Sequence, residues 1–572
     1  MTAVRAVRII TEVTPVDRPF DYLLTDATGN CGVGDRVRVD FNNRSVRGWV
    51  VAEVEPDQQL ELKPITKWLG YGPAPSLLGL LAWASERWCS PLSRFLVSSS
   101  PSRLVTVLPP SPQKLPLEDS VATSAVLVDP GVIQTSPTTD PLALILGAYE
   151  ATRGSQGSLL VLVPTEAWAN RLRGRLEQRG CAVACGDAQW DRMRSGWPVI
   201  VGSRGAALAP TSKVAGAVIV DADDEAYRSE AAPTWDAVAM LRERCARDSA
   251  PLWATSMIPS PELLDDGPYK TSEDIVGGWP RLRVVDRRNS DPRDGVLSRE
   301  ALDAAHRALS GDEPVAVAII LQRLGKGRLF ACRKCGELAR CATCGQGEEE
   351  VGEQLACAAP HELRANFCRS CGATNLKRVR VGVTTLARDV AAQLGQVVTE
   401  VTARTETSVP LARVVVGTEA LWQRVRRCGV VIFVDFDQYL LAPRDSARRH
   451  AVVAVGKAGR LVGSRRDGRG EVVVQTRRRD DVVIRSLEDG DFEEIVRDDV
   501  ETAKVLQLPP YGAFAEVTGE MAGEFVALLD PARVRVYPVD DGFVVRAGNV
   551  DALTTAVREV PRPQGRLRVA IH

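Results

Sequence analysis

The fold class of this chain follows from the run Leu159-Leu160-Val161-Leu162-Val163. An unbroken apolar run of this kind is typical of a parallel strand that is covered on both faces. Residues 166–179 follow with helical spacing and would complete part of a β-α-β unit. Similar short runs occur at residues 199–201, 217–220, 315–320, 414–416 and 430–434. We therefore expect an α/β protein whose parallel sheets hold ligands beyond the carboxyl ends of their strands.

Length and composition limit the class of protein. The chain has 572 residues, enough for about three or four domains. Its net charge of −1 gives no global attraction to nucleic acid or membrane, so an anionic partner would need local basic patches. The first residues lack the apolar core of a signal peptide, and no apolar run approaches the roughly 20 residues of a membrane span. We expect a cytoplasmic protein without membrane contact.

The ends of the chain differ from its middle. Alternating apolar residues at 35–41 and 48–52, with a turn signal at 42–44, predict a β-rich start. A stretch rich in Pro, Ser and Thr from 108 to 140 predicts a linker. An acidic helix near 492–501 and a Pro-Pro turn predict the start of a last, mixed α/β segment.

Seven of the thirteen cysteines are clustered in one short stretch. Its order is Cys332-x2-Cys335-x5-Cys341-x2-Cys344-x12-Cys357-x3-His361-x6-Cys368-x2-Cys371. In each Cys-x2-Cys knuckle, a tight turn places two thiolates where both can bind the same tetrahedral zinc ion. Such a cluster in a large chain without a disulfide framework indicates metal. We predict two zinc ions and an insert that unfolds without them; the alternative is a reduced, metal-free loop.

Two pairings of these ligands are open. In the nested arrangement, which we favour, Cys332, Cys335, Cys368 and Cys371 form one site, and Cys341, Cys344, Cys357 and His361 form the other. A sequential arrangement is the rival. His361 is included because the second zinc would otherwise have three ligands, although a lone His in a polar loop is usually solvated.

Several motifs occur together in one order. They are Phe20-Asp21-Tyr22-Leu23, residues 34–39, 160–164, 201–210, 416–419, 434–437 and 458–476, the zinc-type insert, and Leu508-Pro509-Pro510-Tyr511-Gly512. In these features the chain resembles the PriA (primosomal protein N-prime) family of bacterial superfamily 2 DNA helicases. The resemblance spans nearly the whole chain and is strongest in the insert and the last turn.

The resemblance implies a specific architecture. It comprises two RecA-like, helicase-type lobes with parallel sheets, a β-rich N-terminal DNA-binding domain, a zinc-binding insert in the second lobe and a C-terminal α/β domain. The expected boundaries are 1–108 for the N-terminal domain, 109–140 for the linker, 141–270 and 271–490 for the lobes, 330–375 for the insert and 491–572 for the C-terminal domain.

The motor motifs of that family are eroded. No Gly-Lys-Ser or Gly-Lys-Thr occurs in the chain, and residues 142–163, where we expect the phosphate loop, do not form one. The acidic box is reduced to Asp221, Asp223 and Asp224, a vestigial Walker B motif, and we favour the interpretation that this segment is a solvated turn at the end of a strand. Lys457 replaces an arginine of motif VI and cannot offer its bidentate fork. We predict no catalytic residues and no ATP hydrolysis.

The resemblance also implies a DNA-end pocket. It places Phe20, Asp21, Asn42 and Lys63 around the 3′ end of a strand at a fork. Phe20 could stack on the terminal base, Asp21 could accept a bond from its hydroxyl, and Lys63 could meet a phosphate; the alternative is that Phe20 belongs to the core. Arginines concentrated between Arg424 and Arg479 predict further phosphate contacts.

These observations support a leading hypothesis and two rivals. The leading one is a replication restart protein that binds forked DNA, including a 3′ strand end, without helicase activity. Its implied partners are primosome proteins, the replicative helicase or its loader, and single-stranded DNA-binding protein. One rival is an active ATP-dependent 3′-to-5′ helicase with an unconventional nucleotide site. The other is a zinc-containing scaffold without DNA affinity.

Overall fold

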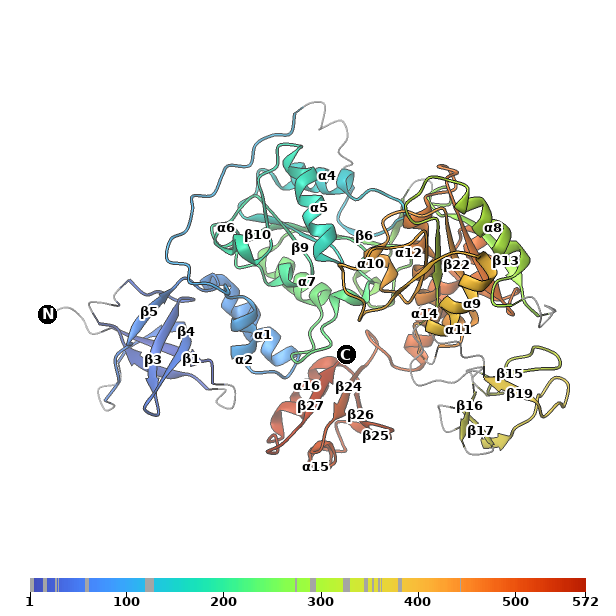
Figure 1. Ribbon diagram of the computed structural model, residues 1–572. Helices are drawn as coiled ribbons and strands as arrows, with labels where there is room; N and C mark the ends of the chain where they lie inside the picture. The colour runs from blue at the N-terminus through green and yellow to red at the C-terminus, as the bar shows by residue number, and fades with distance from the viewer. Residues whose placement is uncertain are drawn as a thin grey trace.

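The structure is a computed structural model with two central lobes and three further regions around them: an N-terminal region, a cysteine-rich insert and a C-terminal region (Figure 1). It describes the chain except residues 1–4, 14–17, 26–27, 29, 57–60, 119–127, 273–274, 289–294, 323–329, 344–347, 352–353, 358–360, 362, 379–382 and 443, and except the side chains of 266, 349–351 and 377–378.

The N-terminal region is a five-stranded antiparallel sheet of order β2-β1-β4-β3-β5. Its strands are β1 (Ala6–Thr11), β2 (Phe20–Leu23), β3 (Arg36–Phe41), β4 (Arg44–Val54) and β5 (Lys67–Gly70). Alternate apolar residues fill its core, as strand geometry requires. Helices α1 (Leu78–Arg87) and α2 (Leu92–Ser98) follow, and their buried residues join the same apolar cluster as one face of the first lobe.

The first lobe is a seven-stranded parallel sheet of order β12-β6-β11-β10-β7-β9-β8. Its elements are β6 (Gly131–Gln134), α4 (Leu142–Thr152), β7 (Ser158–Leu162), α5 (Glu166–Glu177), β8 (Val183–Cys185), α6 (Trp190–Arg194), β9 (Val199–Gly202), β10 (Val214–Ile219), α7 (Ala237–Asp248), β11 (Leu252–Ser256) and β12 (Lys270–Thr271). Leu159 and Val161 pack on one face of the sheet and Leu160 and Leu162 on the other, as expected for a strand buried on both faces.

The second lobe is a six-stranded parallel sheet of order β13-β23-β22-β14-β21-β20. Its elements are β13 (Arg281–Asp286), α8 (Arg299–Leu309), β14 (Val317–Ile320), α9 (Val383–Leu394), β20 (Val398–Val401), β21 (Val414–Gly417), α10 (Leu421–Arg424), β22 (Val430–Phe433), α11 (Asp437–Leu440), α12 (Ala447–Val462), β23 (Glu471–Thr476), α13 (Val482–Asp489) and α14 (Glu493–Val505). Each of the six apolar runs quoted from the sequence is therefore a parallel strand, which confirms the α/β fold class.

Two expected boundaries differ from the packing. The stretch expected as a linker to residue 140 contains β6, which pairs with both β11 and β12. The first lobe therefore begins before residue 141. Helix α14, expected in the C-terminal domain, inserts Ile495 and Val496 into the core of the second lobe. In both cases tertiary neighbours, rather than local composition, decide where the segment belongs.

The cysteine-rich insert and the C-terminal region are small sheets at the lower side of Figure 1. The insert contains β15 (Phe330–Cys332) paired with β19 (Leu376–Arg378), and a three-stranded sheet of β16 (Glu348–Val351), β17 (Gln354–Cys357) and β18 (Leu363–Ala365). The C-terminal sheet has the order β25-β26-β24-β27, built from β24 (Ala513–Thr518), α15 (Ala522–Ala527), β25 (Arg535–Val539), β26 (Gly542–Ala547), α16 (Val550–Glu559) and β27 (Arg568–Ile571). Within the described residues, no helix combines the length and the apolar character needed to cross a membrane.

Candidate functional site

The position of a phosphate loop is fixed by the topology of the first lobe. A P-loop joins a strand to the helix that follows it, at the carboxyl edge of the sheet. Here residues 135–141 join β6, the second strand from one edge of the sheet, to α4. Our placement of this loop at 142–163 is wrong by one element, because that range contains α4 and β7. The segment 135–141 reads Thr-Ser-Pro-Thr-Thr-Asp-Pro and contains neither Gly nor Lys.

The acidic turn lies beside this loop, at the carboxyl end of β10. Asp221 adopts a left-handed conformation with φ of 53°, which is uncommon for a residue with a side chain. The Thr255 hydroxyl at the end of β11 accepts a hydrogen bond of 3.1 Å from the Asp221 amide and helps to hold this turn. The Asp221 carboxylate is thereby presented toward the second lobe, where a helix meets it.

Helix α12 of the second lobe supplies cations to that turn. Arg460 donates two hydrogen bonds, of 2.6 and 2.8 Å, to the two carboxylate oxygens of Asp221. The Lys457 ammonium lies 2.8 Å from a carboxylate oxygen of Asp224. Both carboxylates are largely shielded from water, with side-chain exposures of 8% for Asp221 and 9% for Asp224. The two lobes are therefore joined by ion pairs at the position that a nucleotide would occupy in a motor.

The ionisation of this pair depends on its contacts. Burial by itself would raise the pKa of Asp224, but the Lys457 ammonium and the Ala226 amide lower it below its usual value. Burial would lower the pKa of Lys457, and the Asp224 carboxylate raises it instead. Both groups are therefore charged at neutral pH.

Asp223, the third residue of the vestigial motif, points away from these pairs. Its carboxylate accepts hydrogen bonds from the Ser256 hydroxyl and from the Ser260 amide, the latter at 3.3 Å. Burial raises its pKa above the usual value. Although the three aspartates are neighbours in sequence, the structure does not bring them onto one metal-binding point.

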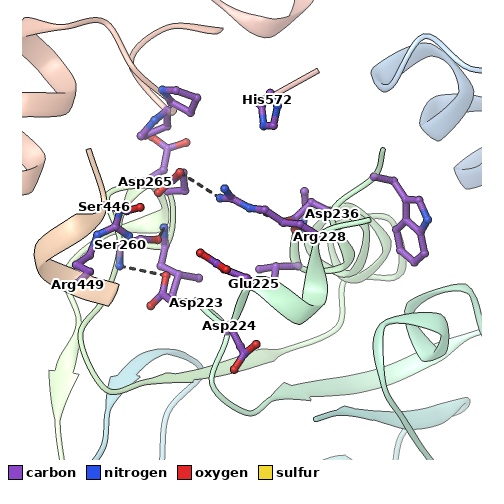
Figure 2. A pocket seen from close by; sticks show the side chains of 18 of the residues that line it. Asp223, Asp224, Glu225, Arg228, Asp236, Ser260, Asp265, Ser446, Arg449 and His572 are labelled. Atoms are coloured by element: carbon purple, nitrogen blue, oxygen red, sulfur yellow. Dashed lines mark hydrogen bonds and ion pairs between the residues drawn. The ribbon is translucent and has the colours of Figure 1, made fainter. Parts of the chain in front are cut away.

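Asp223 lines a cavity of about 460 Å³ where both lobes, α1 and the C-terminal region meet. Figure 2 shows Asp223, Ser260 and Arg449 on one side of it and Arg228 and Asp236 on the other. Arg228 lies 3.3 Å from both Asp236 and Glu262, and acidic residues outnumber basic ones in the lining of the cavity.

The residues at this interlobe site do not fit a nucleoside triphosphate. Phosphate binding in a P-loop requires backbone amides of a Gly-rich turn and a Lys, and the metal requires a free acidic side chain. The loop at 135–141 has neither residue, and Arg460 occupies both oxygens of Asp221. This pairing was not predicted from the sequence, although Lys457 and Arg460 lie three residues apart on α12 and the acidic residues 221–225 follow a buried strand.

The first metal site consists of two equivalent knuckles. The thiol sulfurs of Cys332 and Cys371 are 3.5 Å apart, as are those of Cys335 and Cys368. A tetrahedral zinc with Zn–S bonds of about 2.3 Å would separate its sulfurs by roughly 3.8 Å. In each knuckle the carbonyl of the first cysteine accepts a bond from a glycine amide, Gly336 at 2.9 Å and Gly372 at 2.8 Å. These four residues fit one structural zinc.

The second metal site is described in part. His361 Nδ1 lies 3.6 Å from the sulfur of Cys341 and 3.8 Å from that of Cys357. These three ligand atoms are close enough to share one ion. Cys344, the fourth ligand of the predicted set, lies outside the described residues. The two groups correspond to the nested arrangement, and their donor set is compatible with zinc.

The residues predicted to bind a DNA end lie on the N-terminal sheet. Phe20 and Asp21 are successive on β2 and therefore point to opposite faces. Phe20 is half-buried against Phe41, with ring centroids 4.9 Å apart, next to the exposed Asn42. Asp21 accepts two bonds from Arg8, of 2.9 and 3.1 Å, and Lys63 pairs with Asp40 at 3.1 Å.

Most of the arginines between Arg424 and Arg479 make ion pairs or hydrogen bonds within the protein. Arg448 and Arg449 pair with two aspartates of α14, at 3.2 and 2.8 Å. The other described contacts of this group are Arg424 with two backbone carbonyls, Arg427 with Glu313, Arg444 with Glu225, Arg460 with Asp221, Arg465 with backbone carbonyls, Arg469 with Asp467, Arg477 with Asp437, Arg478 with Asp481 and Arg479 with Glu488. The acids come mainly from other segments, so these pairs offset part of the positive charge that the sequence concentrates in this stretch. Phosphate contact by these arginines stays a prediction.

The fold and these sites define a two-lobed, helicase-type protein with a cysteine-rich insert and an N-terminal antiparallel domain. Residues 8–101 match the family model described as the PriA 3′ DNA-binding domain. With the curated relatives described next, this match shows that the chain belongs to the PriA family.

Three curated relatives are each named replication restart protein PriA. That of Thermotoga maritima is 22% identical over 402 residues, covering 63% of this chain and 53% of the relative. That of Haemophilus influenzae is 23% identical over 354 residues, covering 56% and 47%, and that of Treponema pallidum is 30% identical over 159 residues, covering 26% and 22%. The chain spans about half the length of the first two.

Among solved structures, similarity is found to DEAD-box proteins. Saccharomyces cerevisiae Dbp5 bound to RNA and ADP BeF3 has a TM-score of 0.35 at 12% identity, covering 68% of this chain and 94% of that one. A DEAD box protein from Methanococcus jannaschii has a TM-score of 0.29 at 11% identity, covering 63% and 86%.

Proposed function

We propose that this protein is a replication restart factor that binds forked DNA through residues 8–101 and does not use ATP to unwind it. The match of residues 8–101 to a 3′ DNA-binding domain carries the DNA-binding part of the proposal. In this view the sheet face around Phe20 and Asn42 meets the 3′ end of a strand. The half-buried ring of Phe20 and the exposed amide of Asn42 supply stacking and polar contacts.

The motor part of the proposal rests on the interlobe charges. The carboxylates that would hold a metal are paired with Lys457 and Arg460. Loss of phosphate-loop and arginine contacts of this kind removes several powers of ten in rate. We therefore assign the lobes a scaffolding role between the DNA-binding domain and the zinc insert, whose partners would be primosome proteins, the replicative helicase or its loader, and single-stranded DNA-binding protein.

The test is a titration of the full chain with forked DNA that carries either a free 3′ hydroxyl or a 3′ phosphate at the nascent strand. We expect tighter binding to the free hydroxyl and an affinity that falls with salt. Lys63→Ala should weaken binding, whereas the matched variant Lys67→Ala on the neighbouring strand should not. Equal affinity for forked and blunt duplex would reject fork recognition, and no binding to either DNA would support the scaffold without DNA affinity.

The same preparation tests the motor part. We expect no DNA-stimulated ATP hydrolysis above a blank. Turnover that disappears in Asp221→Ala would reject the proposed inactive motor and support the ATP-dependent helicase alternative.

A further inference from the structure

Helix α12 is seated directly against the first lobe. A Cβ atom added at Gly456 would overlap the sulfur of Met257 and would lie 3.2 Å from Pro137. Met257 and Pro137 both belong to the first lobe, so the glycine lets the helix backbone approach that lobe closely. The interlobe contact is thus a packed surface as well as a set of charges.

Arg460 connects α12 to three separate elements of the first lobe. Besides Asp221, it donates a bond of 2.8 Å to the carbonyl of Pro137, in the loop that stands where a phosphate loop would be. Its guanidinium also lies over the ring of Trp168 on α5, 5.0 Å from the centroid. Such stacking on an aromatic face adds to the ion pair.

The acidic turn receives further cations from the second lobe. Lys457 pairs with Asp224, and Arg444, which precedes α12, pairs with Glu225 at 2.8 Å. Three carboxylates of one turn are therefore neutralised by three cations of the other lobe. The pairs of Asp221 and Asp224 are largely buried, so salt screens them less than it screens an exposed pair.

We propose that these contacts form an internal clamp that holds the two lobes closed without nucleotide. The Lys457 ammonium and the Arg460 guanidinium supply the positive charge that a metal ion would supply beside Asp221 and Asp224. These two carboxylates bind both cations directly, so no phosphate group is needed to join the lobes. The closed arrangement of the lobes is then the resting state of the protein. This inference concerns the interlobe contact alone and stands whether or not residues 8–101 bind DNA.

Amide hydrogen exchange of the full chain tests the clamp. We expect residues 135–141, the turn at 221–225 and α12 to be protected in the wild type, and ATP with Mg²⁺ to leave that protection unchanged. Arg460→Ala should speed exchange in these three segments by on the order of tenfold or more. The matched variant Arg448→Ala removes an exposed pair on the same helix, made within the second lobe, and should not do so.

A second variant opens the lobes without removing a charge. Gly456→Ala should act as a wedge against Met257 and speed exchange in the same segments, whereas Gly174→Ala, in a helix with open space around it, should not. Unchanged exchange in β10 and β22 would show that each lobe stays folded. Equal exchange in wild type and both variants, or protection that appears only with ATP and Mg²⁺, would overturn the clamp. Loss of fork binding with an intact clamp would reject only the proposed function.

Discussion

Arg460 and Asp221 are 239 residues apart in the chain, yet two hydrogen bonds of 2.6 and 2.8 Å join them across the lobes. The bonds are parallel contacts between a planar guanidinium and both oxygens of one carboxylate. This geometry is the strongest form of an ion pair between side chains. Lysine cannot reproduce it, because an ammonium offers a point charge on a flexible stem.

Arg460→Lys should therefore destabilise the protein while keeping its charge. We expect a loss of about 1–2 kcal/mol in the free energy of unfolding, because one charge-assisted hydrogen bond and the stacking on Trp168 disappear. Urea unfolding followed by fluorescence measures it. Arg448→Lys on the same helix should change stability by less than about 0.5 kcal/mol, since its pair is exposed. Equal effects of the two substitutions would contradict a special role for Arg460.

The pair of Lys457 and Asp224 predicts a specific pH dependence. The pKa of Asp224 is lowered, so its contribution is present above the unfolded value of about 3.9 and is lost as pH falls through the folded value. The pKa of Lys457 is raised, so its contribution is present below about 10.4 and is lost as pH rises through the folded value. The pair should stabilise the protein evenly between about pH 5 and 9.

Lys457→Met should remove the stabilisation that this pair provides between about pH 5 and 9. Without the ammonium, burial raises the pKa of Asp224, so the variant loses stability as pH rises above the unfolded value. The difference from wild type should be about 1–3 kcal/mol at pH 7 and should shrink toward pH 3. Unfolding free energies measured at both pH values check this. A difference that grows on acidification would show that the pair has another role.

The strands that the sequence predicted share one property: each is a continuous apolar run, such as Leu159–Val163, whose burial needs no knowledge of its neighbours. Strand β6 was missed because it begins with Gly131 and ends with Gln134, and it is buried only because β11 and β12 flank it. The metal ligands could be grouped from spacing, since the knuckles are local. The contacts of the clamp could not be predicted from the sequence, because their carboxylates are more than 200 residues away from the arginines. In the sequence alone, such arginines resemble a phosphate-binding stretch.

His361 tests the second metal site without altering any thiol. His361→Ala should reduce the bound zinc from two ions per chain to one, because Cys341 and Cys357 lose the ligand that lies within 4 Å of both sulfurs. Elemental analysis after dialysis against a weak chelator measures the stoichiometry. His306→Ala, an exposed histidine on α8, is the control and should retain both ions. Two tightly held ions in the His361 variant would show that the histidine is not a ligand.

The insert also contains a buried ion pair between two residues that are not candidate metal ligands. Arg364 on β18 donates to both carboxylate oxygens of Glu348 on β16, and their side chains are only 6% and 0% exposed. Removing Arg364 would leave the buried Glu348 carboxylate with only the more distant, partly exposed Arg369, 3.8 Å away. Breaking a buried pair in this way typically costs about 3–5 kcal/mol. Arg364→Ala should therefore unfold the three-stranded sheet even with zinc present, and limited proteolysis within residues 348–365 detects that unfolding. Joint replacement by Met at 364 and Leu at 348 should restore resistance, since apolar residues of similar volume can replace a buried pair. If the single variant resists proteolysis as wild type does, metal ligation alone holds the insert.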